Sequence, residues 1–427
     1  MLNLFRPSKV AHSFEQVTSA TQGELSQSLQ ALFQTGDGIQ QRVFDVLLGA
    51  SSVNGGGVAT SGSTRPIPGA ASPGPPPQVK PLSTPQSVQT PSSGWSAIPV
   101  PENVSTQPAT STQAGEGRNS SSPPAIPHED NISGDYPFQP HYVEVFGSKM
   151  HYIEEGTGQP IVFIHGNPTW SYLWRNVLPH LVPYGRCIAV DLIGYGRSEK
   201  PQIEYKWTTQ ARYVEEFFRK MGLHDVVLVL HDWGVSLGLN YAMRHESRVK
   251  AIAFMEGIFK TFPQWDDFST PEFRTLFQKF RQGGQGGEGW KLLVEENFFI
   301  EHLLSGGVGR QLSSKEMDYY REPFKTTSSR IPIWSLARSV PVDGKPSDVW
   351  DALNEISESL KQSRLPKLLL YATPGGIVTE DSVAWCRQHL KNVNTVHVGP
   401  GLHYIQETTP HRIGREIADW YKTVLRC

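Results

Sequence analysis

From about residue 136 onward, short apolar runs alternate with longer stretches that have helical spacing. Two runs, Val143–Val145 and His151–Glu154, predict an antiparallel pair that leads into a sheet. Six further runs are almost wholly apolar, which is typical of strands buried on both faces of a parallel sheet. The sequence therefore predicts an α/β fold with a mostly parallel, eight-stranded sheet and helices on both faces. The six runs are Ile161–Ile164, Cys187–Val190, Val226–Leu230, Ile252–Met255, Leu368–Tyr371 and Thr395–Val398.

The strand pattern stops between about residues 259 and 360. Segments rich in Trp, Phe and Leu replace it, and their apolar residues have helical spacing. This stretch predicts a helical cap inserted at the carboxyl edge of the sheet. That edge is where α/β folds bind their ligands.

The first third of the chain has a different composition. More than half of residues 51–134 are Ser, Thr, Pro or Gly. Such a segment buries too little apolar surface to offset the entropy lost on ordering, so it predicts a disordered linker. Ahead of it, residues 1–50 contain two apolar patterns at helical spacing, which predict short helical segments with no core of their own. The predicted catalytic domain spans residues 135–427.

Charge and cysteine content exclude several classes of protein. The chain has 39 Lys and Arg against 41 Asp and Glu, so its formal net charge of -2 offers no basic footprint for nucleic acid. No run approaches the roughly 18 apolar residues that a membrane span needs. The scattered cysteines Cys187, Cys386 and Cys427 fit neither a disulfide framework nor a zinc site. We therefore expect a cytoplasmic protein with no metal, and the sequence indicates no particular oligomeric state.

The segment Val226–Ala242 carries the clearest chemical signal. An apolar strand runs into a sharp turn and then a helix, with Asp232 at the tip, where α/β-hydrolases hold their nucleophile. A carboxylate there can displace a leaving group from saturated carbon and form an ester that water then hydrolyses. On the residues alone, the alternative is that Asp232 caps the following helix, a common role for aspartate.

Hydrolysis of such an ester requires a base. His403 is the candidate, because it follows the last predicted strand in a glycine-rich turn. A carboxylate must orient the imidazole and stabilise its charge. Glu256 ends the strand after the nucleophile, whereas the other usual position, Thr373–Val378, contains no carboxylate. Asp232, His403 and Glu256 are therefore predicted as a catalytic triad.

Two loops are expected beside this triad. The strand Ile161–Ile164 ends in a His-Gly-Asn-Pro segment, whose backbone and Asn167 amide are expected to face the pocket and stabilise developing negative charge. The alternative is an ordinary turn made by Gly, Asn and Pro. In the next strand-to-turn segment, Asp191 is predicted to brace its loop rather than to take part in chemistry.

Seven motifs together resemble the haloalkane dehalogenases, in the subfamily whose triad acid is a glutamate after the sixth strand. The resemblance covers roughly Phe138 to Leu425, and the motifs are jointly very specific. It implies an α/β-hydrolase fold and a detoxifying enzyme that hydrolyses carbon–halogen bonds of small apolar haloalkanes. The motifs are His165-Gly-Asn-Pro-Thr, Leu173-Trp-Arg-Asn, Asp191-Leu-Ile-Gly, His231-Asp-Trp-Gly, Phe254-Met-Glu, Tyr320-Arg-Glu-Pro-Phe and Gly399-Pro-Gly-Leu-His-Tyr.

Carried onto matching positions, the resemblance implies Asp232 as nucleophile, His403 as base and Glu256 as its partner. The Trp233 indole N–H and the Asn167 side chain would bind the departing halide. No metal or organic cofactor is implied. Apolar cap side chains would exclude water from the substrate pocket. The residues predicted to line that pocket are Phe273, Phe299, Leu303 and Leu402.

Two other reactions remain as alternatives on this fold. Coelenterazine luciferases resemble the same family and retain the same Asp, Glu and His set. Epoxide hydrolases also hold an aspartate at the elbow, but they usually take their acid after the penultimate strand, where Thr373–Val378 has none. The chain also departs from the family: residues 1 to about 134 have no counterpart, and the cap turn Gln282–Gly289 is unusually long and glycine-rich.

Overall fold

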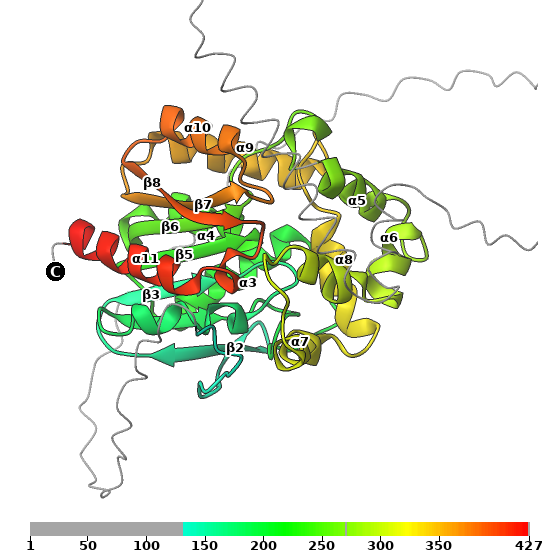
Figure 1. The fold of residues 1–427 in the computed structure, drawn as a ribbon, viewed down its shortest axis with the longest axis horizontal. Coiled ribbons are helices and arrows are strands. Elements are labelled where there is room, and N and C mark those ends of the chain that lie inside the picture. The colour runs from blue at the N-terminus through cyan, green and yellow to red at the C-terminus, as the bar shows by residue number, and fades with distance from the viewer. Residues whose placement is uncertain (1–130, 270, 426–427) are drawn as a thin grey trace, which may run out of the picture. The chain divides into compact units, whose positions relative to one another are not determined.

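The computed structural model describes residues 131–269 and 271–425. The predicted helical segments of residues 1–50 and the predicted linker up to residue 130 lie outside them. The described residues form an eight-stranded sheet flanked by helices, with a cap to one side (Figure 1). The predicted strands are confirmed. They are β1 (His141–Val145), β2 (Ser148–Glu155), β3 (Pro160–Ile164), β4 (Arg186–Val190), β5 (Val226–Asp232), β6 (Val249–Gly257), β7 (Lys367–Pro374) and β8 (Val393–Gly401).

The strand order explains where the site lies. It runs β1-β2-β4-β3-β5-β6-β7-β8, with β2 antiparallel to both β1 and β4 and every other pair parallel. All seven residues of the central strand β5 are buried, as expected when helices cover both faces. In the predicted run Thr395–Val398 only Val398 is buried, because β8 is an edge strand. The prediction that all six runs are buried on both faces is wrong for β8.

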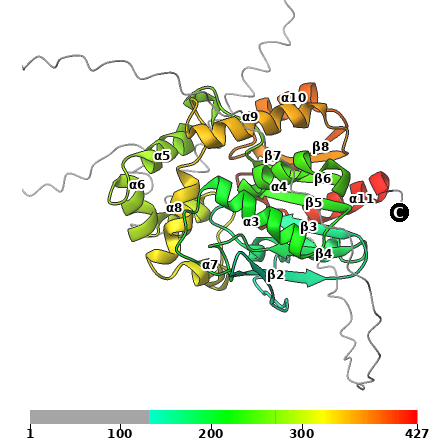
Figure 2. The ribbon, with the colours of Figure 1, turned by 180° about the vertical axis from the view of Figure 1, so that it is seen from behind.

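Helices cover both faces of the sheet. Helices α3 (Trp207–Lys220) and α4 (Trp233–Arg244) pack together on one face, which is in front in Figure 2. Helix α11 (Pro410–Leu425) packs against β7 and β8 on the opposite face, in front in Figure 1, and α10 (Glu380–His389) also contacts these two strands. The buried residues of α3 recur three or four positions apart, so one apolar stripe holds the helix to the sheet.

The cap is formed by the chain between β6 and β7, beyond the carboxyl ends of the parallel strands (Figure 1). The last part of the predicted insertion forms α9 (Ser347–Gln362), which packs against α3 and α4. Residues 347–360 therefore belong to the layer that flanks the sheet and not to the cap. The main cap helices are α5 (Pro271–Arg281), α6 (Glu288–Trp290), η5 (Lys291–Glu295), η6 (Phe299–Leu304), α7 (Ser314–Arg321) and α8 (Ile331–Ala337).

The chain already packs on this domain before β1 begins. The carbonyl oxygen of Ser133 accepts hydrogen bonds from Arg175 Nε at 2.7 Å and Asn176 Nδ2 at 2.9 Å. The Asn131 carbonyl contacts His411 Nε2 at 3.2 Å. Residues 131 to 134, which precede the predicted boundary at residue 135, therefore already include contacts with the domain.

A chain shortened to begin at Asn131 should keep the melting temperature and turnover of the full-length protein, because it retains the contacts of Ser133. A chain that begins at Tyr136 loses hydrogen bonds to buried partners, and its free energy of unfolding should fall by about 1–3 kcal/mol. Calorimetry on the three chains measures the difference. A large loss in the chain that begins at Asn131 would show that residues before it also stabilise the domain.

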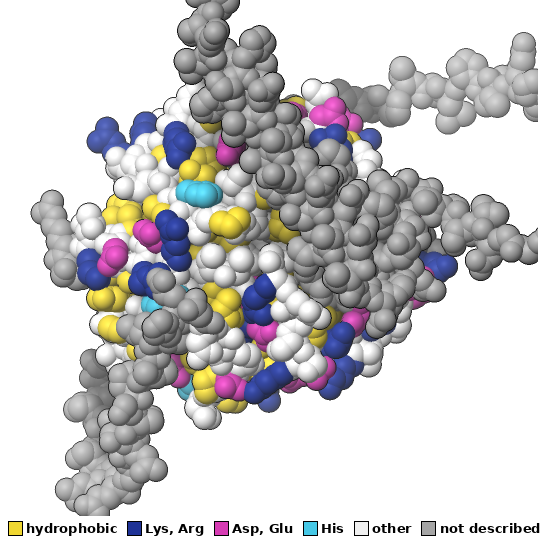
Figure 3. Space-filling model, viewed as in Figure 1, with side chains coloured by type: hydrophobic (Ala, Val, Ile, Leu, Met, Phe, Trp, Pro, Cys, Tyr) yellow, Lys and Arg dark blue, Asp and Glu magenta, His cyan; other side chains and the backbone are white. Residues whose placement is uncertain are grey.

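The helices and the surface charge indicate whether a membrane or a nucleic acid could be a partner. Within the described residues, no helix combines the length and the apolar character needed to span a bilayer. Where the described residues are visible in Figure 3, basic side chains lie among acidic ones. This mixture agrees with the formal net charge of -2.

Candidate active site

Asp232 lies at the turn between β5 and α4, with φ of 53° and ψ of -126°. This conformation is costly for a non-glycine residue and is typical of functional sites. The side chain makes no capping hydrogen bond with the helix, so the alternative role as a helix cap is not observed. Instead, the Asn167 backbone N–H donates to Asp232 Oδ1 at 2.6 Å. Only glycine fits at position 166, because a Cβ there would lie 2.1 Å from the same oxygen.

His403 and Glu256 lie on the other side of this carboxylate. His403 is buried just beyond β8, with Nε2 at 3.4 Å from Asp232 Oδ2 and Nδ1 at 3.3 Å from Glu256 Oε2. The predicted triad residues are therefore brought together. Glu256 Oε2 also accepts hydrogen bonds from the backbone N–H groups of Gly376 at 3.0 Å and Ile377 at 2.8 Å. The loop that lacks a carboxylate thus supplies backbone donors to the glutamate.

The three side chains form a linked electrostatic unit. Burial disfavours a charged imidazole, but the hydrogen bonds with Asp232 and Glu256 outweigh it and raise the pKa of His403 to about 9. Burial also disfavours the charged carboxylate of Asp232, yet contact with His403 keeps its pKa below the usual value. Burial and the nearby His403 lower the pKa of His231 to about 3. At neutral pH the site therefore holds an aspartate, an imidazolium and a neutral second histidine.

Folding stability should depend on the proton of His403. The pKa of this group is raised from 6.5 to about 9 in the folded state, so its stabilising contribution is fully present below about pH 6.5 and is lost as the pH rises through about 9. We expect the free energy of unfolding to fall across this interval, measured by urea denaturation at pH 6, 7.5 and 9. The fall should be smaller in Asp232→Ala, which lacks one of the two carboxylates that raise the pKa. An identical pH dependence in that variant would contradict the assigned ion pair.

The two predicted halide donors lie beside the nucleophile. The buried Asn167 side chain donates through Nδ2 to the Ile333 carbonyl at 3.0 Å and accepts from the Tyr195 hydroxyl at 3.3 Å. These contacts fix the amide and leave its second N–H available. Trp233, the first residue of α4, is 2 % exposed, and no acceptor among the described residues pairs with its indole N–H.

Some supporting residues were not predicted. His231 packs against His403 with 4.7 Å between ring centroids, and its Nε2 donates to the His403 carbonyl at 3.0 Å. Tyr195 was also missed. The only sequence signals were that His231 begins one of the seven motifs and that Tyr195 directly follows another. Asp191 was predicted correctly to brace its loop: it contacts His151 Nδ1 at 2.7 Å and accepts from the Ser171 backbone at 2.7 Å.

Comparisons with known proteins agree with this geometry. The family model of the alpha/beta hydrolase fold matches residues 159–410. A haloalkane dehalogenase from Mesorhizobium japonicum is 41% identical over 285 residues, which are 66% of this chain and 91% of that protein. One from Sphingobium indicum is 42% identical over 293 residues, 67% of this chain and 96% of that protein.

This chain belongs to the haloalkane dehalogenase family. The crystal structure of a haloalkane dehalogenase from Bradyrhizobium elkani matches it with a TM-score of 0.66 and 39% identity, over 68% of this chain and 99% of that chain. The predicted α/β-hydrolase fold and family are therefore confirmed, and this dehalogenase is a hydrolase that acts on carbon–halide bonds.

The predicted pocket residues of this dehalogenase differ in their surroundings. Phe299 is buried and stacks on Phe280 with 6.0 Å between ring centroids, and Leu303 is also buried. Phe273 and Leu402 are half-buried. Their role in lining the substrate pocket stays a prediction.

A separate cavity of about 580 Å³ lies beside α8. Its lining includes Trp334 and Arg338 and contains none of the predicted triad, halide-binding or pocket residues, so it is separate from the predicted active site. Within residues 131–269 and 271–425, no cluster of three or more His, Cys, Asp or Glu has an arrangement that could hold a metal ion.

Proposed function

We propose that this dehalogenase converts small apolar haloalkanes to alcohols through a covalent ester on Asp232. The observation that carries this mechanism is an aspartate at the elbow, in place of a serine, in contact with the paired His403 and Glu256. A carboxylate oxygen of Asp232 attacks the substrate carbon, and the carbon–halogen bond breaks as the carbon–oxygen bond forms. The products of this first step are an alkyl ester and a halide ion.

The leaving halide gains a full negative charge, so donors placed at that atom stabilise the transition state more than the neutral substrate. We assign this role to the Trp233 indole and the Asn167 amide. Support comes from their burial beside the nucleophile, the contacts that fix Asn167 and the unpaired indole N–H. The buried aromatic residues of the cap support an uncharged, apolar substrate.

The second step is hydrolysis of the ester. Esterification removes the charge of Asp232, which is one cause of the raised pKa of His403, so the imidazolium releases its proton to solvent and the neutral imidazole can act as a base. His403 Nε2 takes a proton from water, whose oxygen attacks the ester carbonyl. The Asn167 N–H, 2.6 Å from Asp232 Oδ1, is placed to stabilise the oxyanion. The alkoxide then leaves with the proton of His403, and the Asp232 carboxylic acid passes its proton to His403, which restores the resting aspartate and imidazolium.

An assay with 1-bromohexane and shorter bromoalkanes tests this proposal. We expect one halide ion, one alcohol and one proton for each substrate molecule consumed, and no reaction with Asp232→Ala. Parallel incubations with coelenterazine and with epoxides test the two alternative reactions. Light from coelenterazine, or diol from an epoxide, with no halide released from any bromoalkane would contradict the proposal.

The proposal also places the protein in a reducing compartment such as the cytoplasm. The support for this compartment is that Cys187 and Cys386 are buried free thiols.

Replacing Trp233 by Phe keeps most of the side-chain volume but removes the indole donor. We expect turnover of bromoalkanes to fall on the order of 10²-fold, comparable with the loss of one oxyanion-hole donor. Steady-state halide release measures the effect, and an unchanged melting temperature shows that the fold is retained. Parental turnover by Trp233→Phe would show that the indole does not bind the halide.

A further inference from the structure

One segment of the cap lies along the loop that carries His403. The Gly307 carbonyl accepts hydrogen bonds from the backbone N–H groups of His403 at 3.1 Å and Tyr404 at 3.0 Å. A second contact joins the same two segments further along, where the Gly309 N–H donates to Thr408 Oγ1 at 3.3 Å. A Cβ at position 307 would lie 2.8 Å from the Tyr404 ring, so only glycine allows this approach. The backbone of the predicted base is therefore held by the cap.

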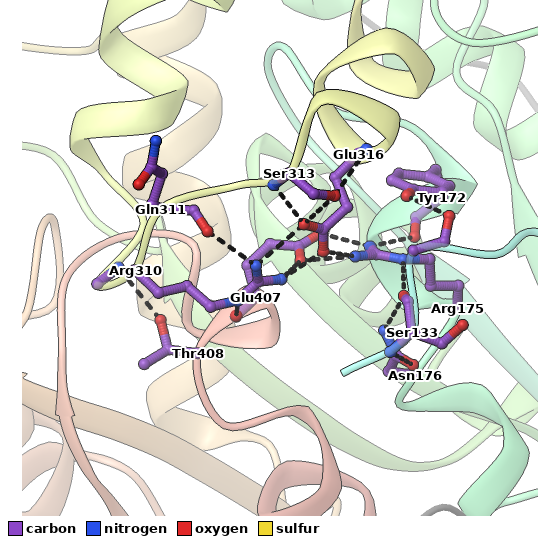
Figure 4. A network of polar contacts seen from close by, with 12 residues as sticks. Ser133, Tyr172, Arg175, Asn176, Arg310, Gln311, Ser313, Glu316, Glu407 and Thr408 are labelled. Carbon is purple, nitrogen blue, oxygen red and sulfur yellow. Dashed lines mark hydrogen bonds and ion pairs between the residues drawn. The ribbon is translucent and has the colours of Figure 1, made fainter. Parts of the chain in front are cut away.

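Four charged side chains reinforce this contact just beyond the base. Arg310, from the cap, donates through Nε to the Glu407 carbonyl at 2.6 Å and through Nη2 to Glu407 Oε2 at 3.0 Å. Arg175, from the core, donates to the same carboxylate through Nη2 at 2.8 Å. Glu316 of α7 contacts both arginines, through Arg175 Nη2 at 2.9 Å and Arg310 Nη1 at 3.0 Å. Figure 4 shows the two carboxylates between the two guanidinium groups.

Three of the four charged side chains are removed from water, and only Arg310 is partly exposed. The Glu407 side chain is 0% exposed, and that of Arg175 is 1% exposed. The Tyr320 hydroxyl of α7 donates to the remaining oxygen of Glu407. Two positive and two negative charges balance, which keeps the cost of burial low. A buried ion network contributes little net stability compared with apolar packing. Its role therefore lies in the position that it gives to the loop between His403 and Glu407.

The geometry matters because the side-chain contacts of His403 are long. Its two ring nitrogens lie 3.3 and 3.4 Å from their carboxylate partners, slightly beyond the usual range for N–H···O hydrogen bonds, so the backbone of the loop also matters for placing the ring. Glu407 follows His403 by four residues through the short helix η9 (Ile405–Glu407). An anchor at Glu407 and the Gly307 carbonyl together fix both ends of the loop that orients the imidazole.

We propose that Arg310 and Glu407 are positioning residues, which hold His403 where it can deprotonate the water that hydrolyses the alkyl ester. The proposal rests on the proposed function of the triad. It adds that the base is in place only when the cap segment is seated on the core. The first step needs no base, so loss of this anchor should slow the second step alone.

The variant Arg310→Met tests the proposal. Met keeps an apolar stem, and Arg175 still contacts both Glu407 and Glu316. Because the Arg310 position is 26% exposed, water can reach the charge that is left, so the protein should fold. We expect the rapid release of the first halide to remain within twofold of the parent, while ester hydrolysis slows on the order of 10-fold or more. As a result kcat and KM should fall together, kcat/KM should be unchanged, and intact mass should show the alkyl-enzyme accumulating during turnover.

Arg321→Met is the matched control. Arg321 is also a cap arginine that donates hydrogen bonds to both oxygens of one carboxylate, Glu301 Oε1 at 2.9 Å and Oε2 at 2.6 Å, but none of its hydrogen bonds goes to the histidine loop. This variant should keep both steps at parental rates. Arg310→Lys retains a charged donor and should recover part of the hydrolysis rate. Glu407→Gln is a less suitable test variant, because it removes a negative charge beside the buried guanidinium of Arg175.

Two outcomes would overturn the proposal. In one, Arg310→Met hydrolyses the ester at the parental rate. In the other, kcat/KM falls as much as kcat, which indicates general distortion of the pocket. Failure of the proposed function has a different signature, because the parent would then release no halide or His403→Phe would form no adduct, whatever the behaviour of Arg310→Met.

Discussion

The His403→Phe variant is expected to release about one halide ion per enzyme molecule and then to stop. Attack by Asp232 on the substrate carbon needs no proton transfer, whereas hydrolysis of the ester requires a base. Phe retains a ring that can pack against His231, so the local fold should persist. After incubation with 1-bromohexane, intact-mass spectrometry should show a stable hexyl adduct, and peptide mapping should place it on the segment that contains Asp232.

Asp232→Ala is the control for this experiment, and it should give neither adduct nor halide under any condition. An inert binding protein on the same fold would leave Asp232 unmodified in both variants. An oxygen-dependent luciferase that had lost dehalogenation would emit light with coelenterazine and form no adduct. Continued turnover by His403→Phe at the parental rate would remove His403 from the mechanism.

Glu256→Gln should cause the second large loss. The amide oxygen of Gln can still accept the hydrogen bonds from Gly376 and Ile377 that Glu256 Oε2 accepts now, so the loop should stay in place. The lost charge no longer stabilises the imidazolium formed during hydrolysis. We expect hydrolysis of the ester to slow on the order of 10⁴-fold, as when the acid of a catalytic triad is replaced by its amide.

Stopped-flow halide release separates the two steps in this variant. The first halide should appear at nearly the parental rate, followed by slow turnover and accumulation of the alkyl-enzyme. The pKa of His403, followed by NMR, should fall because one of the two carboxylates that raise it has become neutral. An unchanged histidine pKa together with rapid hydrolysis would assign the acid role to another residue.

The sheet was predictable because its information is local. Runs such as Val226–Leu230 are apolar at every position, and only a strand covered on both faces buries them fully. The edge strand β8 shows the limit of this reasoning: Thr395–Val398 has a similar composition, but its burial depends on the absence of a ninth strand beyond it among the described residues. The end of the cap was misjudged for a related reason, since the helical pattern of α9 does not reveal that it packs on α3 and α4.

The predicted triad was accessible because each member follows a strand, and carboxyl ends of parallel strands meet at one edge of the sheet. The network around Glu407 had no such signal. Arg175 and Glu407 are 232 positions apart, and neither residue type nor spacing indicates their contact. Long-range ion pairs of this kind depend on the finished tertiary structure, so the residues proposed to position His403 could only be found there.

The contact between Gly307 and the histidine loop has a consequence for protein engineering. Exchanging the cap between related enzymes is a direct way to change which substrates enter, because the predicted triad comes from the core. Here, however, the stretch from Gly307 to Tyr320 also holds the core loop that ends in Glu407. A chimera should therefore retain residues 307–320 of the recipient and replace only the cap segments on either side, so that a new substrate range is gained while the predicted base keeps its supporting contacts.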